Sequence, residues 1–108
     1  MRQFTQDLRR HERILVPTGH TIRVERNGSG PEIAGTISVI GLGGLFLRTR
    51  DFQPAGTVLQ LKLIDSLVTL ESACTVRRVT DNGMGLEITH ISPSDEQKLR
   101  FLLAQFKA

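Results

Sequence analysis

Two short clusters in the sequence contain residue types that are common in anion-binding sites. They are three arginines in the segment RRHER and three glycines in the segment SVIGLGGLFLRT: Arg9, Arg10, Arg13, Gly41, Gly43 and Gly44. Guanidinium groups fork onto phosphates and stack on bases, and glycines let a backbone approach a ligand closely. Each cluster also has an ordinary explanation, because arginines are common on solvated arms and glycines often mark a bend between strands.

The glycine cluster does not match the common nucleotide-binding loops. A dinucleotide fingerprint needs G-x-G-x-x-G leading directly into a helix, and a P-loop needs Gly-Lys followed by Ser or Thr. Here the glycines lead into LFLRT, an apolar stretch typical of a strand, and no Gly-Lys pair is present. Spacing alone therefore favours a glycine bend between two strands.

Catalytic and metal-binding patterns are weak. His11, His20 and His90 lie in different predicted elements without the Cys or carboxylate spacing of a metal site. No G-x-S-x-G elbow is present. Cys74 is the only cysteine and falls in an alternating apolar pattern, which indicates a buried, inert thiol. We therefore predict a protein that is not an enzyme and that uses no cofactor and no metal.

Composition narrows the class of partner. The net charge is +3 with a pI of about 9.8, and aromatic residues make up 5% of the chain, all of them Phe. The few aromatic residues argue against a surface that stacks single-stranded nucleic acid. The mild positive charge favours a compact anionic partner. The first residues, MRQFTQDLRR, lack the apolar core of a signal peptide, and no apolar run approaches the ~20 residues that span a bilayer. We therefore expect a cytoplasmic protein with no membrane partner.

The rest of the chain reads as one domain of strands. Period-two alternation and β-branched residues predict half-buried strands, separated by turns at NGSGP (27–31) and DNGMG (81–85). The predicted strands cover residues 20–26, 32–40, 44–49, 57–64, 68–79 and 86–91. In the strand 68–79, alternation predicts that Arg77 and Arg78 face opposite sides.

The C-terminal segment SPSDEQKLRFLLAQF follows a different period. Leucine and phenylalanine side chains recur at helical spacing, as Leu99, Leu102, Leu103 and Phe106. Ser92 suits an N-cap and Pro93 the first helical position. The chain thus divides into a basic arm (1–13), a β domain (14–91) and a helix of the same domain (92–108). The expected architecture is an antiparallel barrel or sandwich whose edge or open end the helix covers.

In combination, these features resemble the PilZ family. Its members are small six-stranded barrels with a C-terminal helix that bind the bacterial second messenger cyclic di-GMP. The family carries R-x-x-x-R before the first strand and [D/N]-x-S-x-x-G at the end of the second. Arg9 and Arg13 fill the first signature. GMGLEI is similar to the family's G-[VLM]-[GA]-[VL]-x-F ending, with Ile88 in place of Phe. The resemblance implies a mainly β, six-stranded antiparallel barrel with a C-terminal α-helix.

The second signature departs from the family pattern. Aligning its last glycine with Gly44 places Gly41 at the Ser position and Val39 at the Asp or Asn position. In family members the acidic or amide side chain reads a guanine edge, and the Ser helps to hold base or phosphate. Val39 cannot accept a hydrogen bond, and Gly41 offers only its backbone N–H. The other register, with Ser38 at the Ser position, misplaces Gly43 and Gly44, so we prefer the first.

The resemblance implies a non-catalytic cyclic di-GMP receptor or adaptor of bacterial signalling. Its expected ligand-binding residues are Arg9, Arg10, Arg13, Val39, Gly41, Gly43 and Gly44. Binding is expected to fold the arm over the barrel mouth and so to signal to a protein partner. The alternative is a degenerate PilZ-like module that binds a protein and no nucleotide. A third class, nucleic-acid binding through the arm, is disfavoured by the lack of Tyr and Trp. The sequence does not identify the signalling pathway or the protein partner, and it does not decide between a monomer and a homodimer.

Overall fold

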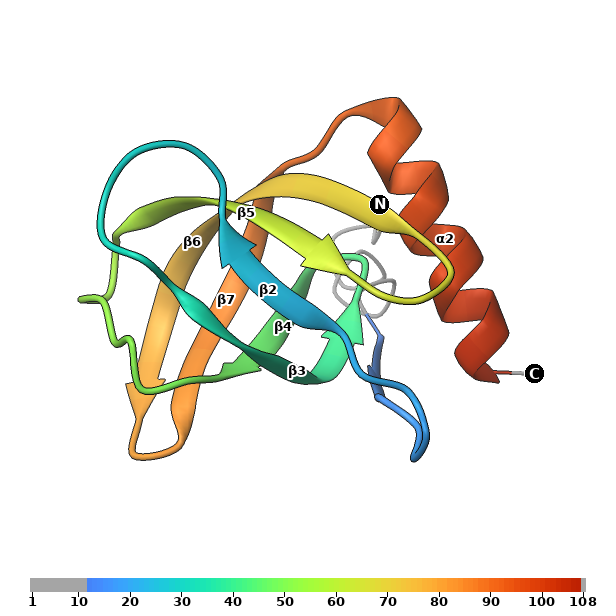
Figure 1. Cartoon of the computed structure of the whole chain (residues 1–108), viewed down its shortest axis with the longest axis horizontal. Helices are drawn as coiled ribbons and strands as arrows, with labels where there is room; N and C mark the ends of the chain where they lie inside the picture. Colours follow the sequence, from blue (N-terminus) through green and yellow to red (C-terminus); the bar gives the residue numbers. More distant parts are fainter. Residues whose placement is uncertain (1–11, 108) are drawn as a thin grey trace, which may run out of the picture.

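We describe residues 12–107 in a computed structural model of the chain. These residues form seven strands and one helix (Figure 1). The elements are β1 (Arg13–Leu15), β2 (Arg23–Arg26), β3 (Ala34–Gly41), β4 (Gly44–Arg48), β5 (Val58–Ile64), β6 (Thr69–Thr80), β7 (Gly83–His90) and α2 (Pro93–Lys107).

Six of the strands close into an antiparallel barrel. They pair in the order β3, β2, β5, β6, β7, β4, and β4 pairs back onto β3. The predicted six-stranded barrel with a C-terminal helix is therefore confirmed. The seventh strand, β1, was not predicted. It lies beside the second half of β3, with Arg13 opposite Gly41 and Leu15 opposite Val39.

One apolar core fills the barrel. In β5, Leu59, Leu61 and Leu63 are fully buried, whereas Gln60 between them is exposed, as the period-two pattern predicts. The helix contributes the predicted stripe, and its side chains join the same cluster as the strand residues. The fold therefore has one hydrophobic core, shared by the barrel and the helix.

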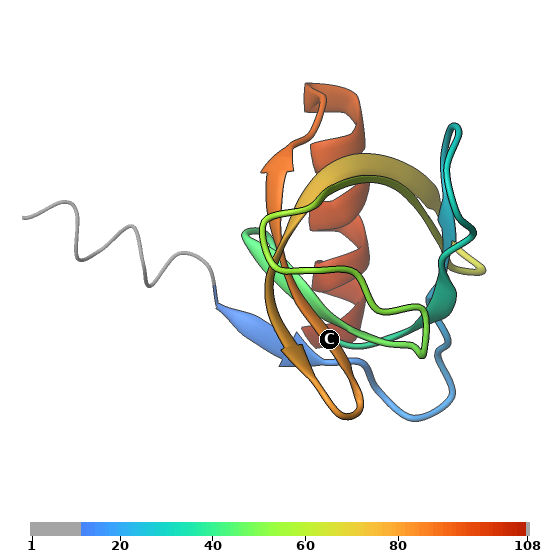
Figure 2. The same ribbon diagram turned by 90° about the vertical axis from the view of Figure 1, so that its left-hand side faces the viewer.

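Helix α2 lies across one end of the barrel, behind the opening seen in Figure 2. Its start has the predicted cap, because the Ser92 hydroxyl accepts from the Asp95 N–H at 3.1 Å and Pro93 is the first helical residue. Near its other end, the rings of Phe106 and His20 meet edge to face with centroids 4.9 Å apart. No helix in residues 12–107 has the length and apolar character needed to cross a membrane.

The last hairpin is tighter than the sequence indicated. We expected residues 81–85 to turn and the strand to begin at residue 86. Instead β7 begins at Gly83, which pairs with Thr80 and leaves only Asp81 and Asn82 in the turn. Gly83 also lies against β4, where an added Cβ would collide with the Leu47 carbonyl oxygen. The glycine in this motif therefore serves close strand packing as well as the turn.

Candidate ligand-binding site

A hollow of about 390 Å³ lies on the outer wall of the barrel. It forms where the start of β1, the β3–β4 turn and the β6–β7 ladder meet. Three arginines, one glutamate, two glycines and a leucine line it: Arg13, Arg77, Arg78, Glu87, Gly43, Gly85 and Leu86. With three guanidinium groups to one carboxylate, the hollow favours an anionic ligand.

Arg13 connects the two sequence signatures in space. It is the first residue of β1, and its guanidinium Nη2 lies 2.8 Å from the position that a Cβ on Gly44 would occupy. Any larger residue at position 44 would displace this guanidinium and would also meet the Leu86 carbonyl oxygen at 2.5 Å. The glycine is therefore needed chiefly for the close approach of the Leu86 backbone, and it also leaves space for the arginine. An arginine of the first signature thus rests on the last glycine of the second.

The other glycines of the cluster also allow close packing of the backbone. A Cβ on Gly41 would collide with the carbonyl oxygen of Glu12, so β1 can dock only against a glycine there. The Gly43 carbonyl accepts the Ile88 N–H at 2.9 Å, which ties the β3–β4 turn to β7. Within residues 12–107, neither glycine has a positive φ. The cluster is therefore a bend and, at Gly43, part of the hollow's wall.

Arg77 and Arg78 both line the hollow, so the prediction that they face opposite sides is wrong. The β6–β7 register shifts between Val76 and Arg78, where Leu86 and Gly85 are the successive partners. This β-bulge adds one residue, Arg77, that has no partner of its own on β7. The extra residue breaks the alternation of side chains between the two faces of the strand. Arg77 and Arg78 are both exposed, and both reach the same concave surface.

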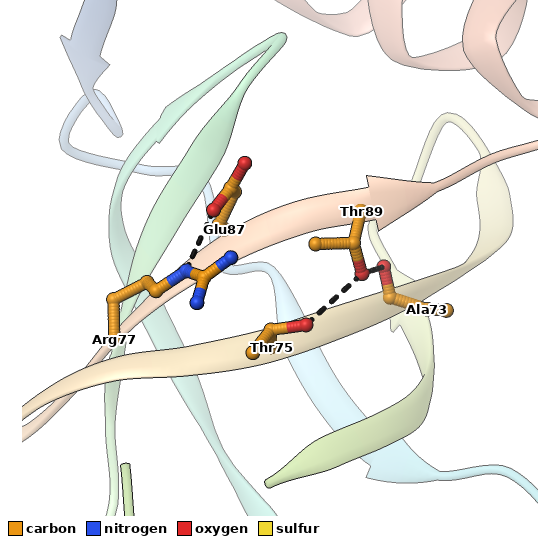
Figure 3. A network of polar contacts seen from close by, with 5 residues as sticks. All are labelled: Ala73, Thr75, Arg77, Glu87 and Thr89. Carbon is orange, nitrogen blue, oxygen red and sulfur yellow. Dashed lines mark hydrogen bonds and ion pairs between the residues drawn. The ribbon is translucent and has the colours of Figure 1, made fainter. Parts of the chain in front are cut away.

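Glu87 gives the hollow its negative charge. Its Oε1 accepts from Arg77 Nε at 2.6 Å across the β6–β7 ladder (Figure 3). The Arg77 and Glu87 side chains are 57% and 48% exposed, so this ion pair contributes at most about 1 kcal/mol to folding. Farther along the ladder, the hydroxyls of Thr75 and Thr89 lie 3.2 Å apart. The Arg77–Glu87 ion pair is therefore a weakly stabilising contact that leaves the carboxylate accessible at the hollow.

The structure brings together only part of the predicted site. Arg13 and Gly43 line the hollow, and Gly44 lies beneath the Arg13 guanidinium. Gly41 is covered by β1, and Val39 is half-buried between Leu15 of β1 and Phe46 of β4 without lining the hollow. The remaining two predicted residues, Arg9 and Arg10, lie outside the described residues.

Sequence reasoning did not assign Arg77, Arg78 and Glu87 to the site. The segment VRRV contained a usable signal, because two adjacent charged residues between valines interrupt the alternation of the strand. Glu87 occupies an outward position between the buried Leu86 and the half-buried Ile88. Its place beside the glycine turn depends on the β4–β7 register, in which it pairs with Gly44. No local pattern reveals that register.

A larger hollow, of about 760 Å³, lies on the outer face of the β2–β3 hairpin. Its lining holds two arginines, Arg23 and Arg26, and two carboxylates, Glu25 and Glu32. Arg23 and Glu25 already form an ion pair at 3.3 Å. Because its charges balance, this surface has less attraction for an anion than the smaller hollow, despite its size.

The lone cysteine lies apart from both hollows. Cys74 is fully buried, and burial raises the pKa of its thiol, a shift that the hydrogen bond with Ser72 partly opposes. A thiol kept protonated in this way is a poor nucleophile. Within residues 12–107, no three His, Cys, Asp or Glu side chains cluster as metal ligands would.

Comparison with known proteins supports the fold described above. The family model described as "PilZ domain" matches residues 7–105. An uncharacterized Legionella protein of known crystal structure is 22% identical, with a TM-score of 0.59, and the match covers 90% of this chain and 95% of that one. The Bacillus subtilis inhibitor of motility is 20% identical, with a TM-score of 0.67 over 88% of this chain. This chain spans 49% of that protein. No curated protein matches the sequence.

Proposed function

The chain belongs to the PilZ domain family, and we propose that it is a non-catalytic receptor or adaptor for cyclic di-GMP in the bacterial cytoplasm. One observation carries the proposal. Arg13 of the first signature lies over Gly44 of the second, and the hollow beside them has a net positive lining. A dinucleotide with two phosphates and two guanines presents the charges and flat surfaces that such arginines bind.

In this proposal, the guanidinium groups carry most of the binding. Arg13 and Arg78 fork onto phosphate oxygens and stack on a guanine. In residues 12–107, neither forms an ion pair within 4.0 Å, so neither has to give up a carboxylate partner from these residues. Arg9 and Arg10 add further charge from the preceding segment, as the family signature implies. Closure of that segment over the ligand is the change that a protein partner detects.

The second candidate function is a PilZ domain that binds a protein and no nucleotide. Val39 and Gly41 favour it, because neither side chain can supply the contacts that the second signature makes in the family. The structure adds that Gly41 is covered by the Glu12 carbonyl, so its surface faces β1. Each missing charged hydrogen bond costs about 1.5–3 kcal/mol of binding free energy. We expect a receptor that is weakened by these losses but still binds, because Arg77, Arg78 and Glu87 supply other contacts.

Isothermal titration of the purified chain with cyclic di-GMP tests the proposal. Cyclic di-AMP has the same phosphates with different bases, and GTP has the same base without the cyclic backbone, so both serve as controls. We expect saturable binding that is tightest for cyclic di-GMP. Equal binding of all three would indicate general attraction of anions. No heat with any of them, confirmed by equilibrium dialysis, would favour the protein-binding alternative.

A further inference from the structure

Glu87 is an unexpected side chain in a hollow suited to anions. It lies among Arg13, Arg77 and Arg78, and its carboxylate is about half exposed at the concave surface. A carboxylate repels phosphate, so a site for phosphate alone gains nothing from it. It is useful where the ligand also presents hydrogen-bond donors. The hollow is therefore suited to a ligand that is anionic at one part and donating at another.

Guanine has such a donating edge. Its N1–H and exocyclic N2 amino group point the same way, and the two oxygens of one carboxylate can accept from both. Adenine offers an acceptor at N1, and hypoxanthine has N1–H but lacks the N2 amino group. A carboxylate therefore distinguishes guanine from both bases.

We propose that Glu87 reads a guanine edge and replaces the acceptor that Val39 cannot supply; this inference rests on the proposed cyclic di-GMP function. The register of the β-sheet is consistent with Glu87 taking the role of the residue at position 39. On β4, Gly44 pairs with Glu87 of β7. Phe46, two residues along β4, pairs with Val39 of β3 on one side and with Gly85 of β7 on the other. Glu87 and Gly85 are two residues apart and share a face of β7. The hydrogen-bond acceptor would thus come from β7 in this chain, where the family signature has it on β3, and both strands belong to the same outer wall.

Arg77 positions this carboxylate. Its Nε donates to Glu87 Oε1 at 2.6 Å, which holds the carboxylate at the hollow and offsets its repulsion of phosphate. Among residues 12–107, Arg77 is the one side chain that hydrogen-bonds to Glu87. Accepting capacity therefore remains on the carboxylate for a base.

The test pairs one protein change with one ligand change. We would measure the dissociation constants of cyclic di-GMP and its inosine analogue, cyclic di-IMP, for the wild-type chain and for Glu87→Met. The two nucleotides have the same charge, so the ratio of their dissociation constants cancels general electrostatic effects. We expect the wild type to favour cyclic di-GMP by about 10- to 100-fold, the value of a hydrogen bond to a charged group. In Glu87→Met the ratio should fall to about one.

Two further variants complete the test. Glu25→Met removes a carboxylate from an equally exposed strand ion pair, that of Arg23 and Glu25, and should keep the wild-type ratio. Glu87→Gln retains an acceptor oxygen and should give an intermediate ratio, which also covers the case in which Glu87→Met fails to fold. A wild-type preference that survives in both Glu87 variants would overturn the proposal, as would equal binding of the two nucleotides by the wild type. If the wild type binds neither nucleotide, the proposed function itself fails, and this inference fails with it.

Discussion

Arg13 is the residue on which the proposed site most depends. It begins β1, its guanidinium lies over Gly44, and it reaches the hollow together with Arg77 and Arg78. A side chain in this position can contact a ligand held against the glycine turn. Residue 44 must be a glycine chiefly because a Cβ there would meet the Leu86 backbone carbonyl oxygen at 2.5 Å, and the Arg13 guanidinium also occupies part of that space.

Replacing Arg13 should weaken the site without harming the fold. We expect Arg13→Ala to reduce cyclic di-GMP affinity by about 10- to 100-fold, because it removes a charge-assisted hydrogen bond. The thermal midpoint should change little, since the side chain lies on the outer wall, apart from the core. Titration calorimetry and a thermal melt would measure both. Arg23→Ala, on the β2–β3 hairpin, is the matched control. Equal losses from both variants would indicate general electrostatics.

At the scale of elements, α2 is held by one face. Phe106 is 9% exposed and belongs to the common core, whereas Phe101 on the same helix is 48% exposed. We expect Phe106→Ala to lower the free energy of unfolding by about 3–5 kcal/mol, through lost burial and the cavity left behind. Phe101→Ala should cost far less. Urea denaturation would measure both, and equal costs would mean that the helix is not docked as described.

Strand β1 depends on a glycine of its neighbour. A Cβ at position 41 would collide with the Glu12 carbonyl, whereas one at position 85 would meet Arg78 Cβ at 3.8 Å, an ordinary contact. Gly41→Ala should therefore displace β1 and expose the amides of its residues to hydrogen exchange. Gly85→Ala should leave their protection unchanged. If Gly41→Ala protects β1 as well as the wild type does, the docking of β1 does not require a glycine there.

The same contrast shows how far the sequence could predict the elements. Alternation was sufficient for β5, because each of its inward leucines contacts one continuous core. Helical spacing was sufficient for α2, because a single face is buried. The strand β1 has only three residues, and its pairing with β3 involves a contact distant in sequence. The bulge at Arg77 changes which side of the strand the following side chains face. A period-two pattern in the sequence cannot predict this, because it assumes that no extra residue is inserted.

For the molecule as a whole, the site is assembled from segments that the barrel closure brings together. The start of β1, the β3–β4 turn and the β6–β7 ladder lie far apart in sequence but line one hollow. The family signatures predicted Arg13 and the glycine turn. They could not predict Arg77, Arg78 and Glu87, because those residues reach the hollow through the register of β7 against β4 and β6. Local motifs thus predict part of the candidate site, and the rest of its lining depends on the closed sheet.

In the proposed function, cyclic di-GMP binds in this hollow and not elsewhere on the barrel. The most direct measurement is a titration of the isotope-labelled chain with cyclic di-GMP, followed by the amide resonances in two-dimensional NMR. We predict saturable shifts at Gly43, Gly85 and Glu87, which share the lining of the hollow. The amides of the larger hollow on the β2–β3 hairpin, such as Gly28 and Gly30, should stay in place. Shifts confined to that hairpin, or none at saturating nucleotide, would contradict the claim.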